Sequence, residues 1–168
     1  GSGGTYDDWV ELYNPTASAI DLTGWSIQKF AGSASSSPVK TDLSGSIPAN
    51  GYFLLARNSA TTSQVLKNLA DLTADNFAIA ANNIVYLVNN NSLITDSSDL
   101  DIIDFVGWGN AYYYEGTGTA PTLTAGKSIV RAPDGEDTNN NSTDFKLTNT
   151  PSPTNSKTAG NSNIGGTV

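Results

Sequence analysis

The stretch Asp8–Ile27, DWVELYNPTASAIDLTGWSI, decides the fold that this sequence predicts. Across residues 9–13 successive side chains fall on two alternating faces, which is the period-two pattern of a β-strand. Asn14-Pro15 ends this strand, because proline cannot donate to a sheet ladder and asparagine favours turns. The apolar positions within residues 20–27 predict the next strand, with Gly24 at a corner that needs an unusual backbone conformation. The stretch therefore predicts a strand, a turn and a second strand.

Further strand patterns follow along the chain. Residues 52–56, Tyr-Phe-Leu-Leu-Ala, are apolar enough to predict a central strand buried on both faces. Residues 84–88 and 93–95 flank the turn Asn89-Asn90-Asn91-Ser92 and predict a hairpin. Other strands are predicted at residues 39–43, 102–109, 128–131 and 144–147.

One short helix is predicted within residues 59–69. Val65, Leu66 and Leu69 share one side of it, and Thr62 or Ser63 can cap its N-terminus. Several short strands with turn residues between them and a single brief helix are typical of an all-β protein. We therefore predict an antiparallel β-sandwich with Greek-key connections.

Composition excludes several classes of function. The 168 residues contain no cysteine and no histidine, so thiolate zinc sites, Cys nucleophiles and Ser-His-Asp triads are excluded. Eight Lys and Arg against 16 Asp and Glu give a net charge of −8, which disfavours nucleic-acid binding. No apolar run is long enough to insert into a membrane. Low charge content with abundant Ser, Thr, Asn and Gly favours an extracellular or cell-surface protein of microbes.

The sequence resembles the bacterial-type lamin tail domain in four ordered blocks. They are residues 9–27, residues 47–57 (IPANGYFLLAR), residues 104–109 with 126–131 (DFVGWG and GKSIVR), and residues 137–145 followed by Pro151-Ser152-Pro153. The resemblance covers roughly residues 6–156. It implies an immunoglobulin-like sandwich that acts as a non-catalytic interaction module, which in bacteria belongs to secreted or surface-attached proteins.

One departure from the family concerns its first strand. Members usually carry an apolar strand before the position of Trp9, where this sequence has Gly-Ser-Gly-Gly-Thr-Tyr. A sheet without that strand leaves a neighbouring strand unpaired and part of the core uncovered. Either trimmed chain boundaries or another segment of the same chain explain the gap, or a terminal segment of a second copy completes the sheet and builds a filament.

The predicted domain boundaries follow composition. Residues 1–5 are expected to be a linker or tag remnant, residues 6–148 the β-sandwich domain, and residues 149–168 a polar tail or linker. Inside the domain we expect five aromatic rings to lie between the two sheets. These are Trp9, Trp25, Phe53, Tyr86 and Phe105.

Carboxylates are the remaining candidates for site chemistry. Acidic pairs such as Asp99 with Asp101 are interpreted as solvated turn residues, so we predict no catalytic residues and no enzyme. The oxygen-rich segment Asp134–Asp144 has the composition of a calcium loop, but its spacing is not that of an EF-hand, and Asx turns produce the same composition. We predict no bound cofactor or metal, with calcium at this segment as the alternative.

Tyr112, Tyr113 and Tyr114 form the candidate binding site. They lie next to glycines where a strand gives way to a long loop, a setting in which aromatic rings either stack on sugars or pack over the end of the sandwich. The predicted function is a non-catalytic secreted or cell-surface interaction module with protein partners or self-association. The alternatives are a filament subunit completed by strand donation and a carbohydrate-binding appendage of a larger enzyme.

Overall fold

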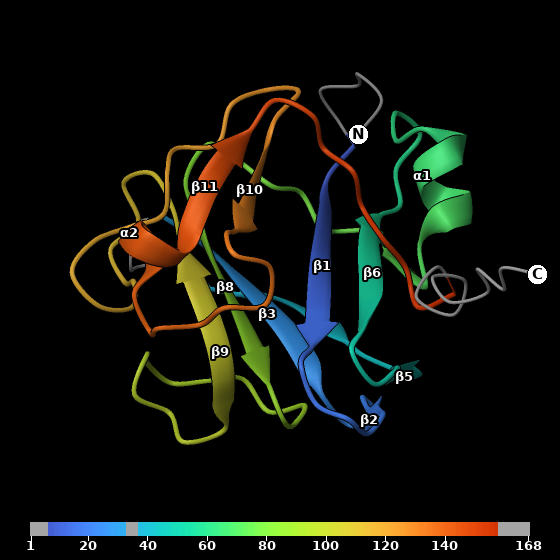
Figure 1. Ribbon diagram of the computed structural model, residues 1–168, viewed down its shortest axis with the longest axis horizontal. Helices are drawn as coiled ribbons and strands as arrows, with labels where there is room; N and C mark the ends of the chain where they lie inside the picture. Colours follow the sequence, from blue (N-terminus) through green and yellow to red (C-terminus); the bar gives the residue numbers. More distant parts are fainter. Residues whose placement is uncertain (1–6, 33–36, 158–168) are drawn as a thin grey trace, which may run out of the picture.

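Two β-layers face each other, and each gathers strands that are far apart in the sequence (Figure 1). The computed structural model describes residues 7–32 and 37–157. One layer is a four-stranded antiparallel sheet. Its order is β4 (Val39–Asp42), β3 (Ser26–Ala31), β8 (Asn83–Val88) and β9 (Ile102–Gly107).

The facing layer is built from two separate sheets. β1 (Trp9–Asn14), β6 (Gly51–Arg57) and β7 (Leu72–Ala74) form the first sheet, in which only the β6–β7 pair is parallel. β10 (Ser128–Arg131) and β11 (Phe145–Thr148) form the second. Ile129 and Phe145 pack against the same core as β1, so the β10–β11 pair continues this layer beyond β1. The predicted β-sandwich is confirmed.

Short elements complete the fold. The strand predicted within residues 20–27 is divided between β2 (Ile20–Asp21) and the start of β3. β2 pairs with β5 (Ser46–Ile47), which had not been predicted as a strand. α1 (Gln64–Leu69) is capped by Ser63, whose side chain accepts a hydrogen bond from Leu66 N, as predicted. Leu66 is buried, but Val65 is 71% exposed, so the expectation that both share the buried side was wrong. A second helix, α2 (Asn141–Asp144), occupies residues where only loop and strand were expected.

The aromatic rings are divided among three cores. Trp25 and Phe53 belong to the main cluster between the layers, as expected. Tyr86 and Phe105 stack at 4.9 Å in a second cluster, because Val85 and Leu87 already supply the inward face of β8 and Tyr86 must point to the other side. Trp9 lies in a third cluster beside α1. The expectation that all five rings lie between the sheets was therefore wrong for three of them.

The predicted hairpin after β8 does not form, since residues 93–95 are not a strand. The buried side chain of Gln28 on β3 binds this segment instead. Its amide donates to Ser92 O at 2.6 Å, and its oxygen accepts from Ile94 N at 3.0 Å. A distant side chain thus satisfies the backbone groups that a hairpin ladder would have used.

The polar segment after β11 folds back onto the domain. Thr154 N donates to the Glu11 carboxylate of β1, and Ser156 donates through its N and Oγ to Asp71. Asn155 is buried, and its amide donates to Leu69 O at 2.6 Å. Residues 154–156 are therefore docked on the sandwich, although their composition predicted a tail. Residues 158–168 of that predicted tail and the predicted linker 1–5 lie outside the described residues.

Candidate functional site

A slot of about 890 Å³ opens between β1 and β10 and reaches the inner face of the sandwich. We call it the β1–β10 slot. Val10 and Leu12 border it on β1, and Ile129 borders it on β10. Its floor is the four-stranded sheet, represented by Ile27, Val85, Leu87 and Val106. Val10, Leu12 and Ile129 belong to the core side of the layer but are only partly buried. The slot therefore exposes core surface that a complete sheet would cover.

The side of the slot formed by β1, which we call the β1 bank, is a free sheet edge. Arg57 N donates to Asp8 O across the β1–β6 pair, so the even-numbered residues of β1 bond to β6. Successive residues of a strand direct their backbone groups to opposite sides, so the N–H and C=O groups of Trp9, Glu11 and Tyr13 point away from β6 and toward the slot. These groups make no hydrogen bond to any residue that the structure describes.

The β10 bank has the same property. Ala132 N donates to Asp144 O, so the even-numbered residues of β10 bond to β11. The backbone groups of Ile129 and Arg131 therefore face the slot, and within the described ranges they too have no hydrogen-bond partner. Two unpaired edges on either side of exposed core surface define the place of a single missing strand.

The two banks also run in the same direction. Figure 1 shows β11 pointing opposite to β1. Because β10 is antiparallel to β11, β10 is parallel to β1. One strand antiparallel to β1 is therefore antiparallel to β10 as well, and it would join the two sheets of this layer into one.

Two loop segments lie over the outer side of β1 and border the slot. Gly135 packs so closely on the Tyr13 ring that a Cβ there would lie 2.3 Å from it, and the Tyr52 hydroxyl donates to Asp134. Thr154 reaches Glu11, as described above. Burial raises the pKa of Glu11 to about 7, against the lowering effect of the Thr154 hydrogen bond.

The charged side chains that line the slot are mostly acidic. The six acidic ones are Asp7, Asp8, Glu11, Asp104, Asp134 and Asp137, and the two basic ones are Lys127 and Arg131.

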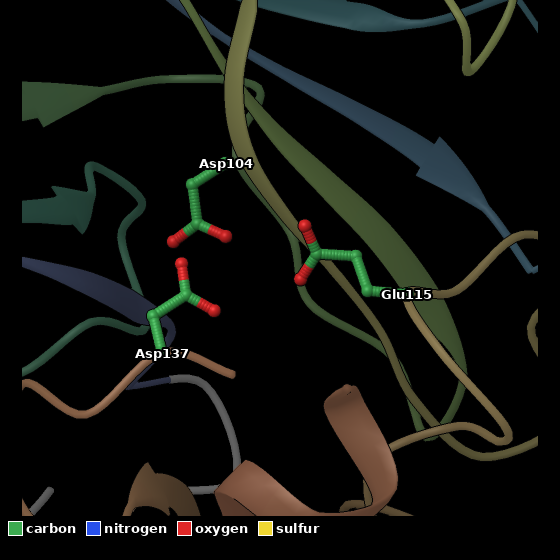
Figure 2. Close-up of side chains that lie close together, drawn as sticks. All are labelled: Asp104, Glu115 and Asp137. Carbon is green, nitrogen blue, oxygen red and sulfur yellow. The ribbon is translucent and has the colours of Figure 1, made fainter. Parts of the chain in front are cut away.

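A cluster of carboxylates lies beside the β10 bank (Figure 2). Oxygens of Asp104, Glu115 and Asp137 approach within 4.8 Å of one another. The Arg131 guanidinium donates to both oxygens of Asp104, at 2.8 and 2.9 Å, and to Asp137 at 3.1 Å. Burial, together with the nearby charge of Asp104, raises the pKa of Glu115 to about 7. Arg131 thus supplies the positive charge next to this cluster.

The segment Asp134–Asp144 uses its oxygens internally. Asp144 is buried and accepts from Thr138 N, Asn140 N and the Thr138 hydroxyl, and Arg131 donates to it at 3.1 Å. Burial raises the pKa of Asp144, but the hydrogen bonds from Thr138, Asn140 and Thr143 outweigh it and lower the pKa to about 2. This geometry is that of turns closed by side chains, and calcium binding here stays the untested alternative.

Asn141 is a structural residue that the sequence did not reveal. Its side chain is fully buried, accepts from Gly107 N at 2.8 Å and donates to Phe105 O at 3.2 Å. Its side chain therefore makes the hydrogen bonds to the outer edge of β9 that a neighbouring strand would otherwise make. It also donates to the Glu115 carboxylate and accepts from Glu115 N. Within an Asn-rich run, no sequence signal separates this amide from its solvated neighbours.

The three predicted binding tyrosines differ in exposure. Tyr113 packs against the cluster that contains Tyr86, whereas Tyr112 is 66% and Tyr114 40% exposed. Tyr112 and Tyr113 meet edge to face at 4.9 Å. Binding through Tyr112, Tyr113 and Tyr114 stays a prediction.

Within residues 7–32 and 37–157, no helix has the length and hydropathy that crossing a bilayer requires. The fold is an immunoglobulin-like β-sandwich. The family model of the lamin tail domain matches residues 1–110, so the chain belongs to the lamin tail domain family. A search of curated proteins found no match.

Proposed function

We propose that this chain is a non-catalytic structural and interaction module that works outside the cell or on its surface. Membership of an immunoglobulin-like family supports an interaction role. Low charge content with abundant Ser, Thr, Asn and Gly supports the extracellular location. Its partners are proteins, including copies of itself, rather than nucleic acids, because the chain carries a net charge of −8.

The β1–β10 slot is the observation that favours self-association. A sheet edge with unpaired backbone groups recruits an extended segment by β-strand addition, in which main-chain hydrogen bonds give affinity. Here two such edges flank exposed core surface, so one strand gains hydrogen bonds on both sides and buries apolar side chains below. A segment that leaves one copy and enters the slot of the next generates a head-to-tail chain of subunits.

Sedimentation velocity on the purified full chain tests this proposal. Species that grow with concentration are expected, together with slowed amide hydrogen exchange at Trp9, Glu11, Tyr13, Ile129 and Arg131. A monomer at every concentration, with these amides exchanging freely, refutes self-association through the slot.

The location needs a separate test. Antibody labelling of intact, unpermeabilised source cells and of their culture medium is expected to detect the chain. Recovery from the cytosolic fraction alone contradicts the extracellular role.

A further inference from the structure

The two banks of the β1–β10 slot also specify how the side chains of an inserted strand would be oriented. On β1, the residues whose backbone groups face the slot are Trp9, Glu11 and Tyr13, and their side chains lie on the outer side of the layer. On β10, the corresponding residue Ile129 points its side chain inward, onto the main core. An antiparallel strand bonds to alternate sides with successive residues. The residues of such a strand whose side chains point outward would form backbone hydrogen bonds to β1. The residues whose side chains point inward would form them to β10. The hydrogen-bonding pattern of both edges therefore fits one and the same strand.

The chemistry of the slot limits which segment can enter. The floor is apolar, so the inward positions of the strand need apolar side chains. The lining holds six acidic side chains against two basic ones, which disfavours a segment with carboxylates. A suitable occupant is therefore an uncharged extended segment with aliphatic residues at an even spacing.

Residues 158–168, TAGNSNIGGTV, have this chemistry. They contain no charged side chain, although the chain as a whole has 24 (16 Asp and Glu with 8 Lys and Arg). In an extended conformation Ile164 and Val168 fall on one face, and Asn163 and Thr167 on the other. Eleven residues reach about 36 Å when extended, whereas a six-residue strand such as β1 spans about 20 Å. Residues 1–6 offer no aliphatic side chain.

The path of the described chain favours the slot of a different copy. Ser156 is bound to Asp71, and Asp71 accepts from Leu54 N at 2.9 Å on the edge of β6 that faces β7. Residue 157 therefore lies on the far side of β6 from the slot. To enter its own slot, the segment would have to cross back over β6 and β1.

Resting on the self-association proposed above, we propose that residues 158–168 of one copy enter the β1–β10 slot of a second copy as a strand antiparallel to β1, with Ile164 and Val168 facing the core. The inserted strand then bonds to Glu11 on one side and to Ile129 on the other.

A matched pair of double variants tests this assignment by sedimentation velocity and hydrogen exchange. Ile164→Ser with Val168→Ser removes the inward apolar groups, and Asn163→Ser with Thr167→Ser alters the same strand on its outward face. Burial of each aliphatic side chain is worth at least a tenfold change in affinity, so the first variant is expected to associate more weakly by about a hundredfold. The second variant is expected to associate like the unmodified chain. A thermal melt of both double variants checks that the sandwich of each monomer stays folded.

The outcomes separate the two proposals. Association that both double variants retain, with the Glu11 and Ile129 amides still protected, overturns the donor assignment and leaves strand addition intact. Protection of these amides in a monomer, lost only in the Ile164→Ser, Val168→Ser variant, places the segment in its own slot and overturns donation between copies. A full chain that stays monomeric with both amides unprotected refutes both proposals.

Discussion

Replacing Asn141 with alanine is expected to be among the most damaging single changes outside the main core. The variant removes the partner of three backbone groups, namely Gly107 N, Phe105 O and Glu115 N, and the donor to the Glu115 carboxylate. Each buried polar group left without a partner costs about 1–3 kcal/mol. Because the loop can relax enough to hydrate some of these groups, the free energy of unfolding should fall by about 3–5 kcal/mol, a large part of the ~5–15 kcal/mol typical of a domain.

Urea unfolding followed by tryptophan fluorescence measures this loss. Asn68→Ala is the matched control, since Asn68 is exposed on α1 and accepts one hydrogen bond from Gln64. The control should change the free energy of unfolding by less than about 0.5 kcal/mol. If Asn141→Ala costs no more than this control, then Asn141 does not hold the β9 edge and the reasoning is wrong.

Three further predictions concern other parts of the molecule. Glu11 and Glu115 have pKa values raised from 4.5 to about 7, so between these pH values the folded state binds protons that the unfolded state does not. The free energy of unfolding should therefore rise as pH falls from about 7 toward 4.5. Glu11→Gln should make this rise smaller, as measured by unfolding curves at several pH values. Calcium should leave the melting temperature unchanged, because the Asp144 oxygens are already hydrogen-bonded; a rise that saturates with added calcium would show a bound ion. Tyr113→Ala should lower the free energy of unfolding by about 1–3 kcal/mol, and Tyr112→Ala by less than about 0.5 kcal/mol. If the unmodified chain binds a glycan in a panel and only Tyr112→Ala loses that binding, Tyr112 belongs to a sugar site.

Strand positions were predictable because their signal is local. The alternation in residues 9–13 and the apolar run 52–56 correspond to β1 and β6, and β6 is the central strand of its sheet as predicted. A period of two does not say which face is inner when both faces are apolar. In β8 that ambiguity placed Tyr86 on the wrong side, since the opposite face of its sheet carries a core of its own.

Long-range side-chain contacts explain most of the other differences. Gln28 holds Ile94 across 66 residues, and Asp71 holds Ser156 across 85. Neither contact leaves a periodic trace in the sequence. The β1–β10 slot was anticipated as a missing strand, but its second bank, β10, became evident only from the arrangement of the sheets.

The burial of Asn141 also bears on how the chain can be produced. Asn141-Ser142-Thr143 matches the acceptor pattern for N-linked glycans, which secretory cells of eukaryotes attach to the nascent, unfolded chain. The nitrogen that would carry the sugar is the one that donates to Phe105 O and Glu115 inside the folded domain. A glycosylated chain could not close this side of β9, so hosts without this modification are the suitable source of folded protein.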